Sequence, residues 1–211
     1  LQHRVQQQAL GGALRQAPER PTTMLVTTKA IVLKTVEHGD NTLVLKAWTE
    51  RSGLRTYLVR TGKGKGRSKA MLQPLNRVEL VALENPEREM HPVREIRVAR
   101  PYMRLLTDPL RGSVALFVQE VLYKVLRQES ADQALDTFIH EALEALDNTS
   151  DLRHYPLVFL IRLSEHLGFM PEPPAPGEDR FDPREGHFTK GPAGHGHTLG
   201  PPLSMALASL L

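Results

Sequence analysis

The sequence predicts an α+β fold, in which a small antiparallel β-barrel is followed by an all-helical domain. Apolar residues alternate with a period of two through much of residues 24–100, whereas they recur at helical spacing within residues 101–211. The charge also changes sign between these two parts. Together, the three observations indicate two modules with different partners.

Five short strands are predicted in the first module, most of them separated by turn residues. The stretch "EHGDN" supplies turn chemistry through Gly39, Asp40 and Asn41, and Gly53 suits a positive φ. Five antiparallel strands in so short a segment are typical of a small barrel, and the OB-fold is the five-stranded member of that class. The predicted strands are 24–36, 42–48, 54–60, 76–83 and 93–100.

Helices are predicted from about residue 108 onwards. Asp108 followed by Pro109 is typical of an N-cap and a first helical position, and apolar residues recur from 114 to 125. Ser130 and Gln133 have the spacing of a capping box before a second helix. We therefore expect helices to begin at these two places.

Later segments predict one central helix and two irregular loops. Pro156 begins a helix that is apolar on several sides, and Gly168 ends it. Proline and glycine then dominate "MPEPPAPGED" and "GPAGHGHTLGPP", which predicts loops. A last apolar helix begins at Ser204, and because the chain ends inside it we expect a truncated C-terminus.

Residues 1–23 are predicted to be a disordered extension or the product of a misassigned start. They are rich in Gln and Ala, begin with Leu and lack the apolar core of a signal peptide. The alternative is an arm that contacts a partner. The domain boundaries that follow are 24–100 for the barrel and 101–211 for the helical domain.

Composition excludes several classes of site. The chain has no cysteine, which excludes disulfides, thiolate zinc sites and a cysteine nucleophile, and which fits the reducing cytoplasm. No run of apolar residues is long enough to cross a membrane. His187, His195 and His197 are a weak metal signal because no third ligand has a fixed spacing, so no metal and no other cofactor is expected.

The net charge of +3 conceals the division between the modules. Residues 24–100 hold 15 Lys and Arg against 8 Asp and Glu, whereas residues 101–211 hold 9 against 15. The first 23 residues hold 3 against 1. The barrel is therefore basic and the helical domain acidic.

The stretch "TGKGKGRSK", Thr61 to Lys69, resembles a phosphate-binding loop at first sight. A Walker A motif would require glycine where Thr61 stands and lysine where Arg67 stands. The G-x-G-x-x-G pattern also fails, because Arg67 occupies its last glycine position. A catalytic nucleotide site is therefore disfavoured.

A nucleic-acid-binding segment fits this region better, although a solvated surface loop remains the alternative. Basic residues without an intervening acid suit phosphate binding, and the glycines allow the backbone to approach closely. Tyr57 or Trp48 could stack on an unpaired base, although we favour a core position for Trp48. The predicted DNA-binding residues are Arg51, Arg55, Arg60, Lys63, Lys65, Arg67 and Lys69.

From residue 24 to about 211, the chain resembles the RecO family of bacterial recombination mediators. The resemblance is strongest in "KAIVLKTVEHGDNTLVLKAWTERSGLRTYLVRTGKGKGRSKAMLQPLNRVEL" and in "LSEHLGFMPE" with "FDPREGHF". It rests on Gly39-Asp40, Leu43-Val44, Thr49, Gly53, the basic glycine loop, Ser68 and Leu72-Gln73-Pro74. Each motif is weak alone, but the combination is fairly specific.

The resemblance implies a non-enzymatic, DNA-binding and strand-annealing mediator in recombinational DNA repair. Members bind single- and double-stranded DNA and help to replace single-strand binding protein by the RecA recombinase, so contact with RecA would be indirect. They contact RecR and the acidic C-terminal tail of single-strand binding protein. A cytoplasmic, nucleoid-associated protein with no membrane partner is implied.

Departures from the family pattern limit what the resemblance implies for the helical half. Many members carry a four-cysteine zinc site there, which this chain cannot form because it has no cysteine. The family's last helices also have no counterpart in the sequence. The cations available for an acidic tail are few, namely Arg104, Arg111, Lys124, Arg127 and Arg162.

Two alternatives remain open. One is an OB-type RNA-binding or ribosome-binding module, because contacts to either nucleic-acid backbone look alike in sequence. The other is a nucleotide hydrolase that uses the glycine loop, which the failed motifs disfavour.

Overall fold

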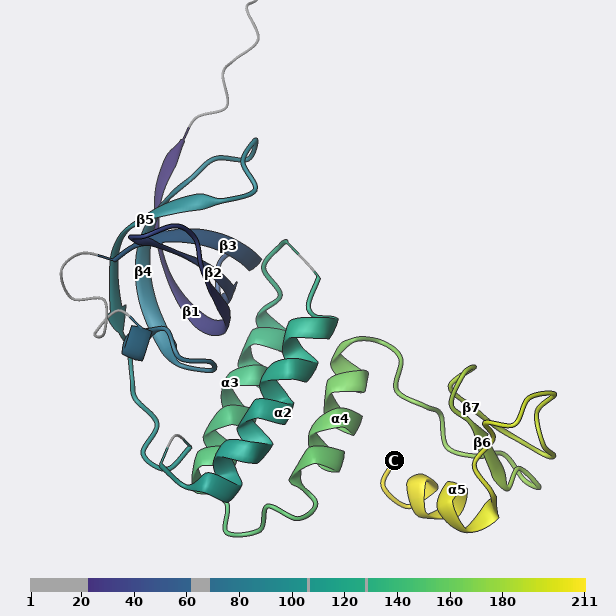
Figure 1. Cartoon of the computed structure of the whole chain (residues 1–211). Helices are drawn as coiled ribbons and strands as arrows, with labels where there is room; N and C mark the ends of the chain where they lie inside the picture. The colour runs from purple at the N-terminus through teal and green to yellow at the C-terminus, as the bar shows by residue number, and fades with distance from the viewer. Residues whose placement is uncertain (1–22, 62–68, 106, 128) are drawn as a thin grey trace, which may run out of the picture.

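The predicted strands are all present and close into a five-stranded barrel, as the α+β fold class requires. The computed structural model describes residues 23–61, 69–105, 107–127 and 129–211. Figure 1 shows the barrel beside a group of three helices, with a smaller unit near the C-terminus. The strands are β1 (Met24–Glu37), β2 (Thr42–Thr49), β3 (Gly53–Arg60), β4 (Arg77–Glu84) and β5 (His91–Val98).

The strand order around the barrel is β1-β2-β3-β5-β4, and closure returns β4 to β1. The long strand β1 pairs antiparallel with β2 along one part and with β4 along the other. Strands β3 and β5 close the barrel in parallel through the pairs Tyr57–His91 and Leu58–Pro92. A closed five-stranded barrel followed by helices confirms the predicted OB-type architecture.

Two separate apolar cores lie on opposite faces of β1 and β2. The barrel interior is formed by alternate strand residues such as Val32, Leu45 and Val59. The outer face of the same strands carries Ile31 and Trp48, which pack with the helices in a second core. Strands β1 and β2 therefore contribute side chains to both cores.

The helical half contains α2 (Pro109–Val125), α3 (Gln133–Asn148), α4 (Tyr155–His166) and α5 (Pro201–Ala208). The predicted cap of α2 is confirmed, because the Asp108 side chain accepts hydrogen bonds from the amides of Leu110 and Arg111. The predicted capping box before α3 is wrong. Asp132 caps α3 instead, because its Oδ1 lies 2.9 Å from the Leu135 amide.

The C-terminal segment adds a small hairpin that the prediction of an all-helical domain did not include. Strands β6 (Arg180–Asp182) and β7 (His187–Thr189) pair antiparallel, and the rings of the directly paired Phe181 and Phe188 pack against each other. Helix α5 begins at Pro201, three residues before the predicted Ser204. The reason is that proline favours the first helical turn, where its missing N–H costs nothing.

Polar contacts fix the barrel against the helices. A β-bulge in β1 leaves the Leu33 carbonyl outside the ladder, and Gln119 of α2 donates to it at 2.8 Å. Trp48 donates its indole N–H to Asp136 of α3 at 3.0 Å, and Arg77 of β4 pairs with Glu144 at 2.7 Å. The two halves thus share both apolar and polar contacts.

Candidate nucleic-acid interface

The seven predicted DNA-binding residues do not form one cluster. Residues 62–68 lie outside the described part of the chain, and with them Lys63, Lys65 and Arg67. Arg51 lies in the turn between β2 and β3, whereas Arg60 ends β3 opposite Thr42. An eight-residue strand separates these two cations by roughly 25 Å. The continuous basic run in the sequence is thus divided between two ends of a hairpin.

Arg55 is engaged by the helical half. Its guanidinium lies 3.2 Å from the Glu129 carboxylate, and its Nη2 donates to the Glu129 carbonyl at 2.9 Å. Arg55 thus links β3 to the segment between α2 and α3. We infer that its phosphate-binding role is weaker than the sequence predicted.

Lys69 remains accessible at the other end of the hairpin, beyond β3. It pairs with Glu37 at the end of β1, and both side chains are more than half exposed. An exposed ion pair contributes little free energy, so a phosphate could replace the Glu37 carboxylate. Arg60 and Lys69 are the two predicted cations that fit best among the described residues.

The two barrel aromatics do not stack on bases in this conformation. Trp48 is 1% exposed and Tyr57 is fully buried. Tyr57 lies in the barrel interior, where burial raises its pKa, and the hydrogen bond that its hydroxyl donates to Glu84 at 2.8 Å raises it further. Trp48 faces the helices, so our preference for a core position is confirmed, although the core is the one outside the barrel.

The open part of the outer barrel face is aliphatic and has a basic border. Val44 of β2 lies opposite Val36 of β1 and Leu58 of β3, and Val36 is 51% exposed. These residues share one face because directly paired residues point to the same side of a sheet. Two residues further along the strands, Arg60 lies at the border of this face.

Two lysines on this face were missed by the sequence analysis. Lys34 and Lys46 are Cα partners across β1 and β2, on the same side as Val44. Their ammonium groups lie 4.7 and 5.6 Å from the ring centroid of Tyr123 on α2. Strand alternation would have placed both outside, but only the tertiary structure brings Tyr123 to them.

The opposite end of the barrel carries charges of both signs. A cavity of about 750 Å³ lies between the start of β3, the β4–β5 loop and the segment before α3. Burial lowers the pKa of His91 on its wall, which disfavours a positive charge there. Four carboxylates and three cations line it: Glu84, Glu87, Glu89 and Glu129, with Lys46, Arg55 and Arg88. The carboxylates outnumber the cations there only slightly, so DNA phosphates should have a modest preference for the end that carries Arg60 and Lys69.

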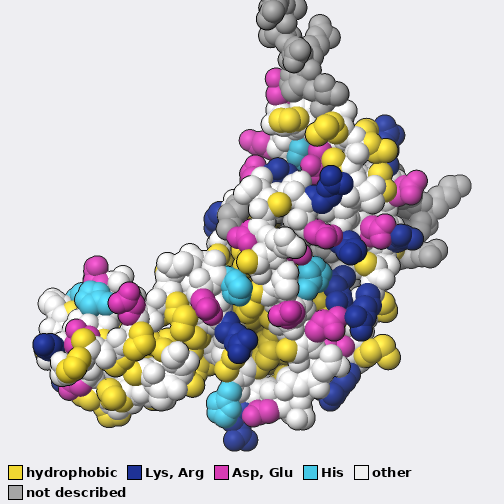
Figure 2. All heavy atoms as spheres, turned by 180° about the vertical axis from the view of Figure 1, so that it is seen from behind, with side chains coloured by type: hydrophobic (Ala, Val, Ile, Leu, Met, Phe, Trp, Pro, Cys, Tyr) yellow, Lys and Arg dark blue, Asp and Glu magenta, His cyan; other side chains and the backbone are white. Residues whose placement is uncertain are grey.

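Cations and acids alternate on the face turned away in Figure 1. Figure 2 shows basic and acidic side chains next to one another there. Arg97 pairs with Glu79 at 2.8 Å, and Arg100 pairs with Glu144 at 3.1 Å. Cations paired with acids in this way are poor candidates for a long phosphate track.

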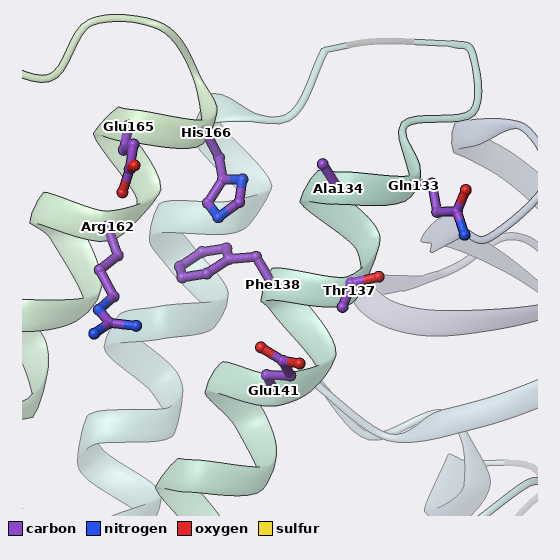
Figure 3. Close-up of a pocket in the computed structure, with 8 residues that line it drawn as sticks. All are labelled: Gln133, Ala134, Thr137, Phe138, Glu141, Arg162, Glu165 and His166. Carbon is purple, nitrogen blue, oxygen red and sulfur yellow. The ribbon is translucent and has the colours of Figure 1, made fainter.

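A second cavity, of about 600 Å³, lies between α3 and α4 (Figure 3). Phe138 lies on its inner side, with the His166 ring stacked on it at a centroid distance of 4.5 Å. Arg162 and Glu165 of α4 and Glu141 of α3 also line it. The lining therefore combines a buried aromatic ring with charges of both signs.

Of the other cations considered for an acidic partner, Arg111 is excluded. It is buried, and its guanidinium donates to the carbonyls of Leu146 and Thr149 at the end of α3. A cation there stabilises the helix C-terminus. Lys124 pairs with Glu120 at 3.1 Å.

The described residues contain no group of three or more His, Asp or Glu positioned to hold a metal ion. His195 lies 3.0 Å from Asp182 at the end of β6, and its ring is 5.8 Å from that of His197. Within the described ranges, no helix is long and apolar enough to span a membrane.

Comparison with family models gives two matches that together cover most of the chain. Residues 24–102 match the model described as Recombination protein O N terminal. Residues 106–173 match the model described as Recombination protein O C terminal. The boundary between the matches falls in the segment that joins β5 to α2.

Several curated relatives carry the name DNA repair protein RecO. The protein from Porphyromonas gingivalis is 30% identical over 186 residues, which are 84% of this chain and 76% of the relative. That from Azobacteroides pseudotrichonymphae is 31% identical over 194 residues, 89% and 80% of the two chains. That from Flavobacterium psychrophilum is 28% identical over 169 residues, 79% and 71%.

Proposed function

The chain belongs to the RecO family and has a role in DNA repair; from this premise we propose that it is a non-enzymatic DNA-binding and strand-annealing mediator. In this proposal the barrel holds DNA, and the bound strands pair without chemical turnover. The failed nucleotide motifs around Arg67 support a role without catalysis.

The observation that carries the proposal is the basic border of the outer barrel face. Arg60 and Lys69 provide cations at one end, the sequence between them adds three more at 62–68, and carboxylates slightly outnumber cations in the cavity at the other end. Because Trp48 and Tyr57 are buried, contact should be made mainly with the DNA backbone. Such contact has little sequence preference, as annealing of arbitrary strands requires.

The helical half supplies the protein contacts in this proposal. Its acidic character disfavours DNA, whereas the α3–α4 groove combines an aromatic ring with Arg162 and His166. We assign this groove to the acidic C-terminal tail of single-strand binding protein. RecR would bind elsewhere on the protein, and RecA would load after the exchange, in the nucleoid.

The central test of this proposal replaces the basic residues between positions 62 and 68. Lys63, Lys65 and Arg67 are replaced together by Glu, and DNA binding and annealing are measured over a salt series. We expect weaker binding, a flatter dependence of log K on log salt, and slower annealing, because phosphate contacts release counterions. The assay is repeated with DNA coated by single-strand binding protein, where the parent should still anneal.

A matched control reverses three cations in the acidic half, namely Arg153, Arg184 and Lys190. This variant has the same change in net charge, so it should anneal nearly as the parent does. If the variant with Glu at positions 63, 65 and 67 anneals DNA as well as the parent does, these three residues do not bind the DNA. Competition between DNA and RNA of equal length decides the remaining alternative, since a preference for RNA would favour the RNA-binding module.

A further inference from the structure

Two lysines face each other across β1 and β2 without a carboxylate between them. Lys34 and Lys46 are direct Cα partners, and like charges at such positions destabilise a sheet. Among the described residues, neither lysine has an ion-pair partner. Lys46 also lines the cavity that holds Glu84, Glu87, Glu89 and Glu129, but none of these carboxylates forms an ion pair with it, and Glu129 is engaged by Arg55. The fold thus maintains two like charges in direct register.

Tyr123 brings these two charges to one point. The Lys34 ammonium lies 4.7 Å from its ring centroid and the Lys46 ammonium 5.6 Å. The negative face of an aromatic ring attracts cations, so the ring offsets part of their repulsion. One helical turn earlier, Gln119 fixes α2 to the bulge in β1 through the Leu33 carbonyl. The position of the ring is therefore set by the barrel itself.

We propose that Lys34 and Lys46 together bind one backbone phosphate of DNA, with Tyr123 as the residue that positions them. This inference rests on the proposed function and adds a contact that the predicted set lacked. Lys46 lies four residues from the end of β2 that pairs with Arg60, or about 14 Å along the strand. A strand that passes Arg60 and crosses the aliphatic face would reach the two lysines.

A purely structural role is the competing explanation. The lysines lie near the last turn of α2, where positive charge favours the helix dipole, and they could simply hold α2 on the barrel. That role predicts an effect on stability alone. Phosphate binding predicts an effect on the salt dependence of DNA affinity, which a structural contact would not alter.

The test uses the full chain with K34Q, K46Q and the double variant, and measures single-stranded DNA affinity over a salt series. If the lysines share one phosphate, each single variant retains a cation there and keeps nearly the parent slope. The double variant should lose about tenfold in affinity at 50 mM salt, and its slope should fall by roughly 0.7, the value for one phosphate of single-stranded DNA.

Two results would overturn the shared site. One is a double variant with the parent slope, and the other is a slope that falls by a full phosphate in each single variant. K29Q, on the same strand but outside this face, serves as the matched control and should retain both affinity and slope. A parent chain that binds no DNA would instead reject the proposed function.

Tyr123 is tested by Y123F and Y123L. Phe keeps the aromatic face and should bind DNA as the parent does, whereas Leu should weaken binding by a few fold because the lysines lose their common anchor. Emission of Trp48, the chain's one tryptophan, reports whether the barrel–helix contact is intact. If Y123L is folded and binds DNA as tightly as the parent does, Tyr123 does not position the lysines.

Discussion

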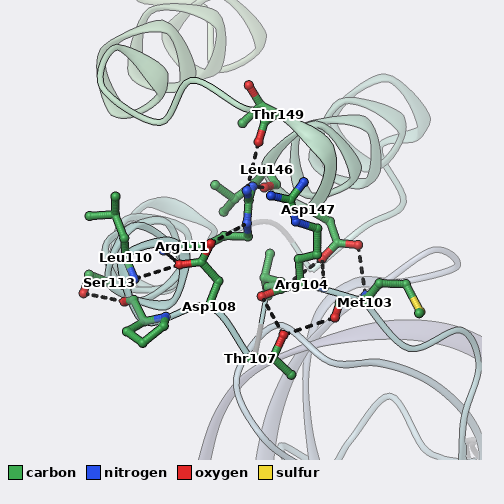
Figure 4. A network of polar contacts seen from close by, with 12 residues as sticks. Met103, Arg104, Thr107, Asp108, Leu110, Arg111, Ser113, Leu146, Asp147 and Thr149 are labelled. Carbon is green, nitrogen blue, oxygen red and sulfur yellow. Dashed lines mark hydrogen bonds and ion pairs between the residues drawn. The ribbon is translucent and has the colours of Figure 1, made fainter.

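At the scale of single residues, Asp147 organises the passage from barrel to helices (Figure 4). Its carboxylate accepts the backbone amides of Met103, Arg104 and Leu105 at 3.0, 2.9 and 2.7 Å. Burial alone would raise the pKa of Asp147, but these three donors, with the nearby Arg111, lower it. The ionised form is therefore the one the fold requires.

The first prediction at this scale concerns D147N. The amide keeps the shape but offers one acceptor oxygen and opposes the backbone donors with its own N–H groups. We expect a loss of roughly 2–3 kcal/mol in the free energy of unfolding at neutral pH, since the lost hydrogen bonds are to a charged group. Urea unfolding measures it, and D40N, in an exposed turn, is the control.

The pH dependence of this effect has a definite sign. A folded-state pKa below the unfolded value of about 4 gives stability that is complete above that value and is lost as pH falls through the folded pKa. The difference between parent and D147N should therefore shrink on acidification below about pH 4. A constant difference would show that ionisation of Asp147 does not contribute.

At the scale of elements, the groove between α3 and α4 depends on a stack of aromatic rings. Phe159 of α4 stacks with Phe138 of α3 at 5.8 Å, which holds α4 against α3, and within α4 it stacks with Tyr155 at 6.2 Å. His166 covers the other side of Phe138. The ring surface is thus set by two helices, and Arg162 adds a positive charge beside it.

This arrangement predicts opposite effects from two changes in one groove. Isothermal calorimetry with a synthetic peptide of the single-strand binding protein tail should show weaker binding to R162Q, by about fivefold, and tighter binding to E165Q. The magnitude is that of an exposed ion pair near its upper limit. Equal affinities for all three proteins would argue that the tail binds elsewhere.

At the scale of the whole molecule, the barrel and the helices share one apolar core. Ile31, Leu33 and Trp48 are buried on the outside of the barrel, where they pack with residues of α2, α3 and α4. The barrel surface would expose this patch if the helices were removed. The barrel and the helices therefore have no clean energetic boundary between them.

A fragment of residues 24–100 tests this point. It keeps the whole barrel interior, yet we expect it to aggregate or to unfold at lower urea than the parent, with red-shifted Trp48 emission. A fragment of residues 24–169, which keeps α2, α3 and α4, should fold with parental emission. A 24–100 fragment as stable as the longer one would show that the shared core is dispensable.

Much of this fold could be predicted from the sequence because its signals are local. Strand alternation and turn residues placed all five strands, and Asp108 with Pro109 marked the start of α2. The start of α3 was missed because Ser130 and Asp132 both suit a cap, and only the local backbone decides between them. The β6–β7 hairpin was missed because three-residue strands have no periodicity.

The sequence alone determined the barrel, the helical half, their opposite charges and the absence of cysteine chemistry, because each depends on residue identity or short-range spacing. The tertiary structure decided which cations can act together. It separated Arg51 from Arg60, joined Arg55 to Glu129, and brought Tyr123 to Lys34 and Lys46. Contacts between residues 70–90 positions apart leave no local pattern, so only the folded chain reveals them.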